Sequence, residues 1–448
     1  MSQSNTSSLG VTLAGVRLAS PLGVGAVGLP NIELRHLTPE RHTDLLLEHA
    51  QAGAGFICLP LATHVPDEML AELEKKARSF NYSWEPAQPA YMKIEEQGLE
   101  GLYLFGSPRT PPKRVARRFN REVAKMIEIL KQNKPPGVPL VANISGLGAF
   151  SETFSITAEA CEDAGVDLIE LNLSCPMAVS LEEAPECYFK QDFPLILAGF
   201  LLGDQPELVG RITKRVTEAV NIPVGVKLSP ETGFPRIIEV ARKAKEAGAK
   251  FINCGNMGMT IAPPDIYRRG KPKWLIADGN PFVPAGGSWL RPIIYKQIAA
   301  ISKFVPGIDL IATGGLTSPQ HIVEAMMLGA KATEMVTGVL YHGRDLIRKS
   351  NEFLLRYMKE QGYGSVEEFI GLGLEYVKSG DKIKVDSGKM VAEVDQEKCV
   401  GCGICTDSIC LASYMDEGFA RIKVDDCLGC GMCVAICPEG AISLKVRE

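Results

Sequence analysis

Short apolar runs alternate with longer amphipathic segments between residues 11 and 360. The short runs are bounded by Gly or Pro and have the pattern of buried strands, whereas the longer segments repeat their apolar residues with the period of a helix. This alternation is typical of a parallel sheet wrapped by helices. The predicted strands are Leu22 to Val27, Gly55 to Leu61, Val138 to Ile144, Asp167 to Leu173, Val224 to Leu228, Phe251 to Cys254, Leu310 to Thr313 and Ala332 to Val336. The predicted helices are about Pro39 to Ala52, Lys113 to Gln132, Phe154 to Ala164, Pro206 to Val220, Pro235 to Ala247, Arg291 to Phe304, Pro319 to Leu328 and Gly343 to Gln361.

Eight strand-helix units in about 350 residues predict an α/β fold of the TIM (β/α)8 barrel type. A doubly wound sheet is the alternative, because the number of strands does not show closure. We expect the barrel to span residues 1–362, a helix and linker 363–392, and a small α+β domain 393–448. Two long connections, 62–112 and 177–204, are predicted to cover the catalytic end of the barrel or to pack as small cores of their own.

Composition narrows the classes of function. A chain of 448 residues with 46% hydrophobic and 23% charged residues is long enough for a barrel and a small domain. The net charge of −5 offers no basic surface for nucleic acid. Residues Met1 to Gly10 lack the features of a signal peptide, and no run approaches the roughly 18 apolar residues of a membrane span. These features predict a cytoplasmic protein without a membrane span.

The C-terminal region carries the most specific motif of the chain, since eight of the 13 cysteines lie in the last 50 residues. They form the runs Cys399-x2-Cys402-x2-Cys405-x4-Cys410 and Cys427-x2-Cys430-x2-Cys433-x3-Cys437-Pro438. In two-cluster ferredoxins the fourth Cys of each run binds the other cluster. One [4Fe-4S] cluster is therefore predicted on Cys399, Cys402, Cys405 and Cys437, and a second on Cys427, Cys430, Cys433 and Cys410. The first run departs from the usual pattern by one extra residue before Cys410 and by Leu411 in place of Pro.

Zinc is the alternative occupant, because paired Cys-x2-Cys motifs also bind zinc. Eight thiolates in two runs of three plus one fit zinc poorly. The cysteines therefore predict two iron-sulfur clusters, a ferredoxin-like domain and a reducing compartment. Since such clusters conduct single electrons, the barrel must hold a group that accepts or releases them. Three other cysteines, Cys58, Cys161 and Cys254, are predicted to be core residues.

A reactive thiol is predicted at the end of the fourth strand. Glu170 and Asn172 lie two residues apart in this strand and share one face. Pro176 cannot continue the strand, so Cys175 falls at its carboxyl edge, where TIM barrels carry out their chemistry. A Cys at such a position is often an inert core residue. The neighbouring motifs favour a catalytic role.

Glycines at the ends of several strands predict a phosphate site and a flat cofactor. Loops after the seventh and eighth strands of a TIM barrel form a common phosphate site, because Gly lets backbone N–H groups meet the anion. Gly286 and Gly287, in the loop after the sixth strand, offer further donors, and Gly23 lets a flat ring approach the backbone. The candidates at the two phosphate loops are Gly314, Gly315, Thr337 and Gly338.

Lys227 lies in an otherwise apolar strand, where an unpaired ammonium would be costly to bury. An inward Lys therefore needs a partner. Two interpretations stay open, a structural ion pair and a cation beside N1 of a flavin, where positive charge stabilises the reduced ring.

Together these motifs resemble the FMN barrel of the dihydroorotate and dihydropyrimidine dehydrogenase family. The resemblance rests on Asn172 to Pro176, Lys227 to Pro230, Asn256, Gly286-Gly287-Ser288 with Arg291-Pro292, and Ala312 to Gly315. A barrel followed by a two-cluster ferredoxin domain also resembles the ferredoxin-bearing subunits of bacterial NAD-dependent dihydropyrimidine dehydrogenases. The resemblance implies FMN as cofactor, Cys175 as acid/base, Asn172 and Asn256 as substrate ligands, and Lys227 as an FMN contact.

Several positions depart from that family. Leu59-Pro60-Leu61 replaces a Thr-Lys-Thr type segment, so its Lys is missing. Met257 and Met177 stand where polar residues are usual, and no Asn-containing segment is found near Leu104. Each change replaces a polar group by an apolar one, and unpaired polar groups on a ligand are costly to bury. The departures favour a substrate that is less polar than a pyrimidine.

The predicted function is a flavin-dependent oxidoreductase acting on CH-CH groups. It reduces or forms an activated C=C bond of a small molecule, with electrons passing singly through the clusters. A thiol of ordinary pKa, about 8.5, is mostly protonated at neutral pH and suits the role of proton donor for Cys175. No nicotinamide-binding Gly-x-Gly-x-x-Gly motif is found in a suitable context. The expected redox partner is therefore an external electron carrier or an NAD(P)H-oxidising flavoprotein subunit, and the family resemblance implies a homo-dimer or a hetero-oligomer.

Three other functions remain as alternatives. The chain could be a dihydroorotate dehydrogenase proper. It could be an electron-transfer subunit whose partner carries out catalysis. It could also bind a phosphorylated substrate without a flavin, as a lyase or isomerase, but its clusters would then lack a two-electron acceptor.

Overall fold

The computed structural model describes residues 9–26, 38–69, 71, 90–94, 100–105, 119–146, 151–175, 202–273, 282–378, 387–408 and 410–447. The chain divides into two compact units, Met1–Tyr376 and Val377–Glu448. Most of the predicted covers 62–112 and 177–204, including Met177, lies outside the described residues. None of the helices in the described parts of the chain is both long and apolar enough to cross a membrane.

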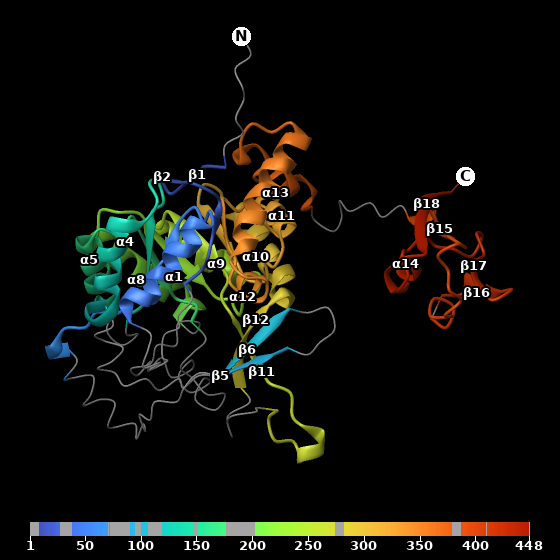
Figure 1. Ribbon diagram of the computed structural model, residues 1–448, viewed down its shortest axis with the longest axis horizontal. Coiled ribbons are helices and arrows are strands. Elements are labelled where there is room, and N and C mark those ends of the chain that lie inside the picture. Colours follow the sequence, from blue (N-terminus) through green and yellow to red (C-terminus); the bar gives the residue numbers. More distant parts are fainter. Residues whose placement is uncertain are drawn as a thin grey trace, which may run out of the picture. The chain divides into compact units, whose positions relative to one another are not determined.

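Eight parallel strands of the first unit form one sheet, with the order β3-β14-β13-β10-β9-β8-β7-β4. The first strand, β3, pairs with the last, β14, and the other neighbours in the sheet follow one another along the barrel strands of the chain. A parallel bridge between Val24 and Ile57 joins the two edge strands. The sheet therefore curls into a nearly closed barrel with helices outside it (Figure 1), which confirms the predicted TIM barrel and excludes the doubly wound sheet. The strands are β3 (Leu22–Gly23), β4 (Ile57–Cys58), β7 (Leu140–Ile144), β8 (Leu168–Asn172), β9 (Val224–Leu228), β10 (Phe251–Cys254), β13 (Asp309–Thr313) and β14 (Ala332–Glu334).

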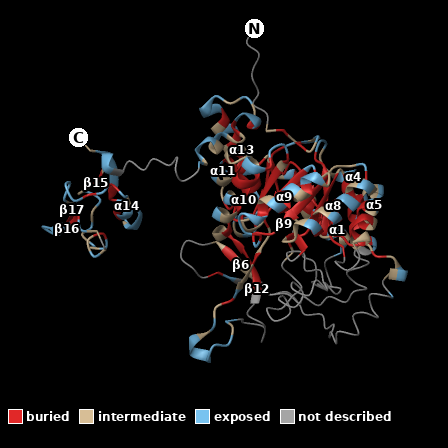
Figure 2. Cartoon of the chain, turned by 180° about the vertical axis from the view of Figure 1, so that it is seen from behind, coloured by how far each residue is buried: buried red, intermediate tan, exposed pale blue. Residues whose placement is uncertain are grey.

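Helices pack their apolar faces against the outside of the barrel, and their outer faces are exposed (Figure 2). Local sequence sets their ends: α5 stops at Gly165 and α13 at Gly362, both with left-handed backbone, at φ of 92° and 78°. The helices are α1 (Pro39–Gln51), α4 (Ala124–Asn133), α5 (Glu152–Ala164), α8 (Pro206–Ala219), α9 (Arg236–Glu246), α10 (Arg291–Phe304), α11 (Pro319–Met327), α12 (Thr337–His342) and α13 (Asp345–Gln361). A π-helical turn, Phe119–Val123, leads into α4.

A second, antiparallel sheet was not predicted. Its order is β11-β12-β6-β5, and it lies beside the carboxyl ends of the barrel strands (Figure 1). Its strands are β5 (Ala90–Lys93), β6 (Gly101–Phe105), β11 (Gly258–Ile261) and β12 (Phe282–Gly287). Gly286 and Gly287, predicted in a loop, therefore end a strand that pairs with β6. A hairpin of β1 (Val11–Leu13) and β2 (Val16–Leu18) was also not predicted.

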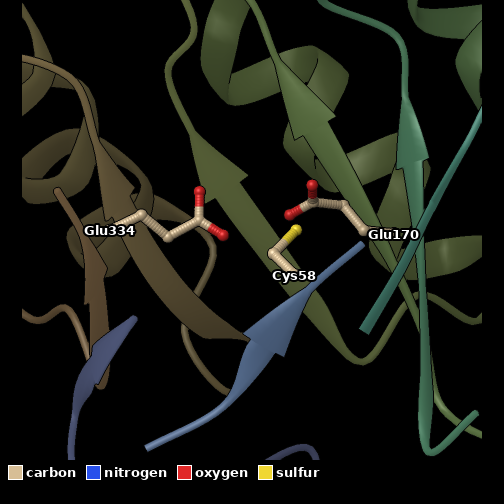
Figure 3. A group of neighbouring side chains, drawn as sticks. All are labelled: Cys58, Glu170 and Glu334. Carbon is tan, nitrogen blue, oxygen red and sulfur yellow. The ribbon is translucent and has the colours of Figure 1, made fainter. Parts of the chain in front are cut away.

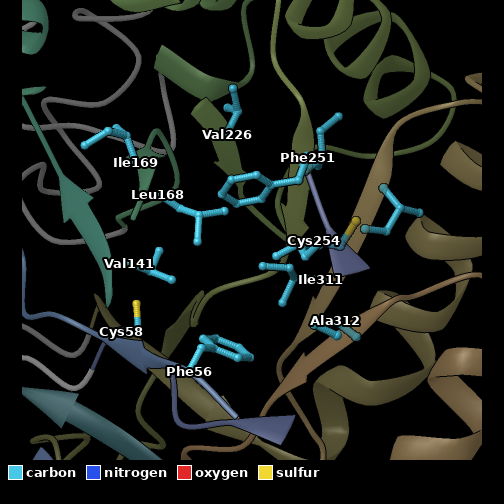
Figure 4. Close-up of a cluster of buried hydrophobic side chains, with 14 of the residues drawn as sticks. Phe56, Cys58, Val141, Leu168, Ile169, Val226, Phe251, Cys254, Ile311 and Ala312 are labelled. Atoms are coloured by element: carbon cyan, nitrogen blue, oxygen red, sulfur yellow. The ribbon is translucent and has the colours of Figure 1, made fainter. Parts of the chain in front are cut away.

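The inside of the barrel has an apolar layer formed by Phe56, Val141, Leu168, Phe251 and Ile311, all buried. Figure 4 shows the two phenyl rings with Leu168 inside the circle of strands. A side chain at Gly23 would overlap the ring of Phe56, and one at Gly225 would overlap the ring of Phe251. Small residues on facing strands thus make room for the rings, whose burial stabilises the barrel by about 1.5–3 kcal/mol each.

The described residues of the second unit form two short antiparallel pairs of strands, a short α-helix and a 3-10 turn at Ser387–Lys389. Strand β15 (Met390–Val394) pairs with β18 (Ile442–Val446), and β16 (Ser413–Asp416) pairs with β17 (Phe419–Ile422). Helix α14 spans Met432–Ile436. The core of this unit is small, and Cys405, Cys427 and Cys433 belong to it. Small domains with so little apolar core commonly gain stability from bound metal.

Candidate active site

A polar layer lies directly above the apolar layer, at the carboxyl ends of the strands. Because side chains alternate along a strand, Glu170 follows Leu168, Asn253 follows Phe251 and Lys227 follows Gly225 on the inner face. The register of the parallel strands then places Lys227 beside Asn253, and Thr313 beside Glu334. The polar layer comprises Cys58, Asn143, Glu170, Lys227, Asn253, Thr313 and Glu334, all of them buried.

Two carboxylates face the ammonium group of Lys227. Its Nζ lies 3.1 Å from Oε2 of Glu334 and 3.5 Å from Oε1 of Glu170. Nδ2 of Asn253 joins the two carboxylates, donating to Glu170 Oε2 at 2.6 Å and to Glu334 Oε2 at 3.1 Å. Figure 3 shows the two carboxyl groups pointing toward each other, with Cys58 nearby. The partner that the sequence requires for Lys227 is therefore a pair of glutamates.

The charges in the polar layer shift each other's pKa. Burial acts to lower the pKa of Lys227, but the negative charges of Glu170 and Glu334 outweigh it and raise this pKa. Burial acts to raise the pKa of Glu334, but Lys227 and the hydrogen bonds from Thr313 and Asn253 outweigh it and lower this pKa. For Glu170, burial and the charge of Glu334 outweigh Lys227 and raise the pKa. At neutral pH the layer thus holds an ionised Lys227–Glu334 pair, with Glu170 as the more readily protonated carboxyl.

The donor atoms of Cys58, Glu170 and Glu334 lie within 4.8 Å of one another, as in a metal site. The ammonium group of Lys227 already neutralises the carboxylates of this group. Burial, followed by the charges of Glu334 and Glu170, raises the pKa of Cys58 far above its ordinary value and keeps it a thiol. Because metals bind thiolates rather than thiols, we assign no metal to these residues.

Hydrogen bonds connect the polar layer to the predicted catalytic stretch. Asn143 donates from Nδ2 to Glu170 Oε1 at 2.5 Å, and Asn172 donates from Nδ2 to Asn143 Oδ1 at 3.0 Å. The hydroxyl of Ser174 donates to Asn172 Oδ1 at 2.9 Å, and Nδ2 of Asn256 donates to Ser174 Oγ at 2.8 Å. The structure thus brings Asn172 and Asn256 together through Ser174, the residue before the partly exposed Cys175.

The loops after β13 and β14 pack against each other. Gly314 and Gly315 adopt left-handed backbone, with φ of 115° and 78°. A Cβ at Gly338, in α12, would lie 3.0 Å from Leu316 O and from Thr317 Cα. The candidate phosphate residues of the two loops therefore lie close together. His321 supports the first loop, since its Nδ1 accepts from the backbone N–H groups of Thr317 and Ser318 at 3.1 and 3.2 Å.

Three further predicted glycines have different surroundings. Gly23 is opposed by the Phe56 ring, and Gly287, with φ of 140°, lies against Glu100 and Gly101 of β6. Close packing explains both of these glycines. Gly286 is different, because a Cβ there would lie at an ordinary contact distance, 3.5 Å, from Met257 Cγ and Thr337 Oγ1. Close packing of the backbone therefore does not explain Gly286, and its neighbours are the side chains of Met257 and Thr337.

Several members of the polar layer were not predicted from the sequence. Asn143, Asn253, Thr313 and Glu334 are inward polar residues in apolar runs. This is the signal that identified Lys227, and it was available for each of them.

Glycines between the cysteines of the second unit share one backbone conformation. Gly401, Gly403, Gly429 and Gly431 all adopt left-handed backbone, with φ of 69°, 77°, 64° and 77°. Two backbone N–H groups, of Gly429 and of Ala392 in β15, donate to Cys427 Sγ, both at 3.4 Å. N–H···S bonds of this kind tune the potential of iron-sulfur clusters.

Thiols from both runs are brought together in this unit. Burial raises the pKa of Cys405, and the neighbouring thiols of Cys399, Cys402 and Cys437 act in the same direction. Burial likewise raises the pKa of Cys433, with further contributions from Cys410 and Cys427. The last Cys of each run therefore lies close to the other run.

Comparisons with known proteins found a family match in each of the two units. Residues 194–358 match the family model of dihydroorotate dehydrogenase, and residues 392–438 match that of the 4Fe-4S dicluster domain. The catalytic subunit of dihydroorotate dehydrogenase B (NAD(+)) from Thermococcus kodakarensis is 32% identical over 53% of this chain and 69% of its own length. The NAD-dependent dihydropyrimidine dehydrogenase subunit PreA of Escherichia coli K12 is 26% identical over 62% of each chain. A putative dihydroorotate dehydrogenase A (fumarate) from Aeropyrum pernix is 29% identical over 64% of this chain and 89% of its own length.

Proposed function

The chain belongs to the dihydroorotate dehydrogenase family, and on that premise we propose that it reduces or forms an activated C=C bond of a small molecule. It is an oxidoreductase of an FMN-binding family, and its dicluster domain indicates two [4Fe-4S] clusters. The observation that carries the proposal is the connection of the polar layer, through Asn172 and Ser174, to Cys175 at the carboxyl ends of the strands.

The residues at these strand ends fit FMN. The Gly314-Gly315 loop and the Thr337-Gly338 segment lie together and offer backbone N–H groups to its phosphate. Gly286, between Met257 and Thr337, would border the ring, and the positive charge of Lys227 would stabilise its reduced form. Gly23 and Gly287 would shape the same site by letting Phe56 and β6 pack closely. When bound, FMN exchanges single electrons with the clusters and a hydride with the substrate.

The chain's own residues bind the substrate and supply a proton. Each side-chain amide has two N–H donors, and the contacts described above use one from Asn172 and one from Asn256. The remaining donors would bind carbonyl oxygens of the substrate and orient it. Cys175 Sγ would then donate a proton to one carbon of the double bond, or accept it in the reverse direction. Leu59-Pro60-Leu61 follows Cys58 of the polar layer, and Met257 follows Asn256. These apolar residues favour a substrate less polar than a pyrimidine.

The two groups of cysteines would hold the clusters in crossed fashion. Cys399, Cys402, Cys405 and Cys437 would bind one cluster, and Cys410, Cys427, Cys430 and Cys433 the other. The proximity of Cys405 to Cys437 and of Cys433 to Cys410 supports this assignment. Because the Escherichia coli relative is described as a subunit of an NAD-dependent enzyme, we propose that this chain exchanges electrons with a separate NAD(P)H-oxidising flavoprotein or with an external carrier.

Dihydroorotate oxidation is the second candidate, favoured by the 32% identity to the Thermococcus kodakarensis catalytic subunit. Purification and substrate screening under argon test both candidates. We expect FMN, iron and sulfide in the isolated chain, and reoxidation of reduced flavin by an electron-poor alkene. Flavin bleaching by dihydroorotate would favour the second candidate. Iron and sulfide without flavin, even after reconstitution with FMN, would refute the proposal.

A further inference from the structure

The polar layer holds one ammonium group and two carboxylates, and we propose that Glu170 and Glu334 share one exchangeable proton, taken up from solvent as electrons reach the flavin. The inference rests on the proposed position of FMN above the carboxyl ends of the strands. It assigns to these glutamates a role in coupling protons to electrons. They act through charge on the flavin site and are positioning residues.

With both carboxyls ionised, the layer carries one more negative charge than its ammonium group balances. Glu170 and Glu334 are fully buried, and Lys227, 4% exposed, is the cation between them, at 3.5 and 3.1 Å. The excess charge lies inside the barrel, where uncompensated charge is costly, and it raises the affinity of the pair for one proton. The pair therefore offers one proton-binding site that fills when further negative charge is added nearby.

Among the residues that the structure describes, the titratable groups that face the pair come from barrel strands. Lys227 projects from β9, and Cys58 from β4. Lys227 stays protonated and Cys58 stays a thiol, for the reasons given above. The amides of Asn143 and Asn253 donate to the carboxylates and do not titrate. The two carboxyls are thus the members of this layer that can change protonation at neutral pH.

The surroundings of the two carboxyls differ. Glu334 is closer to Lys227 and also accepts from the hydroxyl of Thr313 at 2.7 Å, which favours its ionised form. Its second oxygen, Oε1, is buried without a hydrogen-bond partner in the described part of the chain. Glu170 lies farther from the ammonium and feels the charge of Glu334. Glu170 is therefore the carboxyl that binds the proton when it is taken up.

The layer is well placed to respond to charge on a flavin. Glu170 lies two residues before the end of β8, and Lys227 lies one residue before the end of β9. Glu334 is the last residue of β14. A flavin ring at the strand ends would rest on this layer. Two electrons from the clusters add two negative charges, and one proton bound by the ring cancels one of them. The remaining charge raises the pKa of the carboxyl pair, which then binds the second proton from solvent.

The pH dependence of the flavin midpoint potential tests the inference in the full-length holoprotein. We expect the wild-type protein to bind two protons for every two electrons. The equilibrium constant of flavin reduction then changes a hundredfold per pH unit, and the midpoint potential changes by about 60 mV per pH unit. Glu170→Gln should bind only one proton, a tenfold change, or about 30 mV per pH unit. Glu334→Gln should show the same loss, because Glu170 then becomes the sole carboxylate of Lys227 and stays ionised. Glu231→Gln is the matched control, since this half-buried carboxyl accepts from Met259 N and does not contact Lys227.

Infrared difference spectra of wild type give a second readout that does not depend on the folding of any variant. Reduction should produce the C=O band of a protonated carboxylic acid. A wild-type slope of one proton per two electrons, the absence of this band, or an unchanged slope in Glu170→Gln would each overturn the inference. A slope of the midpoint potential that is equally reduced in Glu231→Gln would overturn the inference as well. Failure to bind FMN at all would refute the proposed function instead, so the two failures are distinguishable.

Discussion

The side chain of Lys227 is held inside the barrel by charge. It is buried among residues that form an apolar core below it and an amide network beside it, and its ammonium group has two carboxylate partners. Removing one member of a buried ion pair is strongly destabilising, because it leaves uncompensated charge away from water. The stability of the barrel therefore depends on this lysine.

We predict that Lys227→Met lowers the free energy of unfolding by about 3–5 kcal/mol at neutral pH. Without the ammonium group the pKa values of Glu170 and Glu334 both rise in the folded state. Above the pKa of the unfolded carboxyls, the folded state then binds more protons, so the variant loses stability as pH increases from about 5 to 8. Urea unfolding at several pH values measures the effect.

Lys331→Met is the control for this experiment. Lys331 forms a 2.7 Å ion pair with Asp309, but its side chain is 37% exposed and remains in contact with water. A pair of this kind contributes about 0–1 kcal/mol. Equal losses in the two variants, or no dependence on pH in Lys227→Met, would contradict the role assigned to the buried charges.

The proposed acid at Cys175 leads to a second prediction. Cys175→Ala should retain FMN, because the phosphate candidates lie on other loops, but reoxidation of reduced flavin by the substrate should slow by about 10²–10⁴-fold. Stopped-flow absorbance under argon measures this step. Cys161→Ala is the matched control, since this thiol is buried in α5. Unchanged reoxidation in Cys175→Ala would remove the thiol from the mechanism.

A polar residue within an apolar run was the signal from which individual site residues could be predicted. Lys227 was expected to need a partner, and Glu170 was expected to share a face with Asn172. The partner Glu334 was overlooked because it is 107 residues from Lys227 along the chain. The register of four adjacent strands, β9, β10, β13 and β14, brings the two residues together, and the pattern of a single strand contains no information about this register. The prediction that Cys58, Cys161 and Cys254 are core residues is confirmed by their burial.

At the scale of elements, the parallel strands were predicted best. Strands β9 and β10 have the predicted ends, because they are buried on both faces and read as continuous apolar runs. The antiparallel sheet was not predicted, since β6 and β12 are separated by about 180 residues and have mixed patterns. Gly286 and Gly287 were read as a loop because Gly disfavours strands in general. Pairing with Gly101 and Leu102 overrides that preference.

The same pairing makes Gly287 a sensitive position. With φ of 140° and the backbone of Glu100 and Gly101 where a Cβ would be, Gly287→Ala should lower the free energy of unfolding by about 1–3 kcal/mol. It should also weaken FMN binding by displacing Gly286. Gly233→Ala is the control, because nothing lies within 4 Å of a Cβ there and its φ is not positive. Urea unfolding and flavin release measure the two effects, and equal stability of the two variants would contradict the packing argument.

Crossed ligation in the second unit can be tested by pairs of substitutions. If Cys437 belongs with Cys399, the double variant Cys399→Ala/Cys437→Ala should lose one cluster and keep about four of eight irons. The matched double variant Cys399→Ala/Cys410→Ala should lose both clusters. Ligation within each run predicts the opposite pattern. Iron and sulfide analysis with electron paramagnetic resonance of the reduced protein distinguishes the two arrangements.

The whole molecule joins a one-electron unit to a two-electron site, and the variant without clusters separates their contributions. In full-length Cys399→Ala/Cys410→Ala the barrel should still bind FMN, and a single reoxidation of chemically reduced flavin by the substrate should keep its wild-type rate. Steady-state turnover driven by a one-electron donor protein should fall by at least about tenfold, since electrons must then reach the flavin without the clusters. Stopped-flow and steady-state rates measured on the same samples make the comparison. If turnover persists while both clusters are absent, electrons enter at the barrel directly and the ferredoxin-like unit has another purpose.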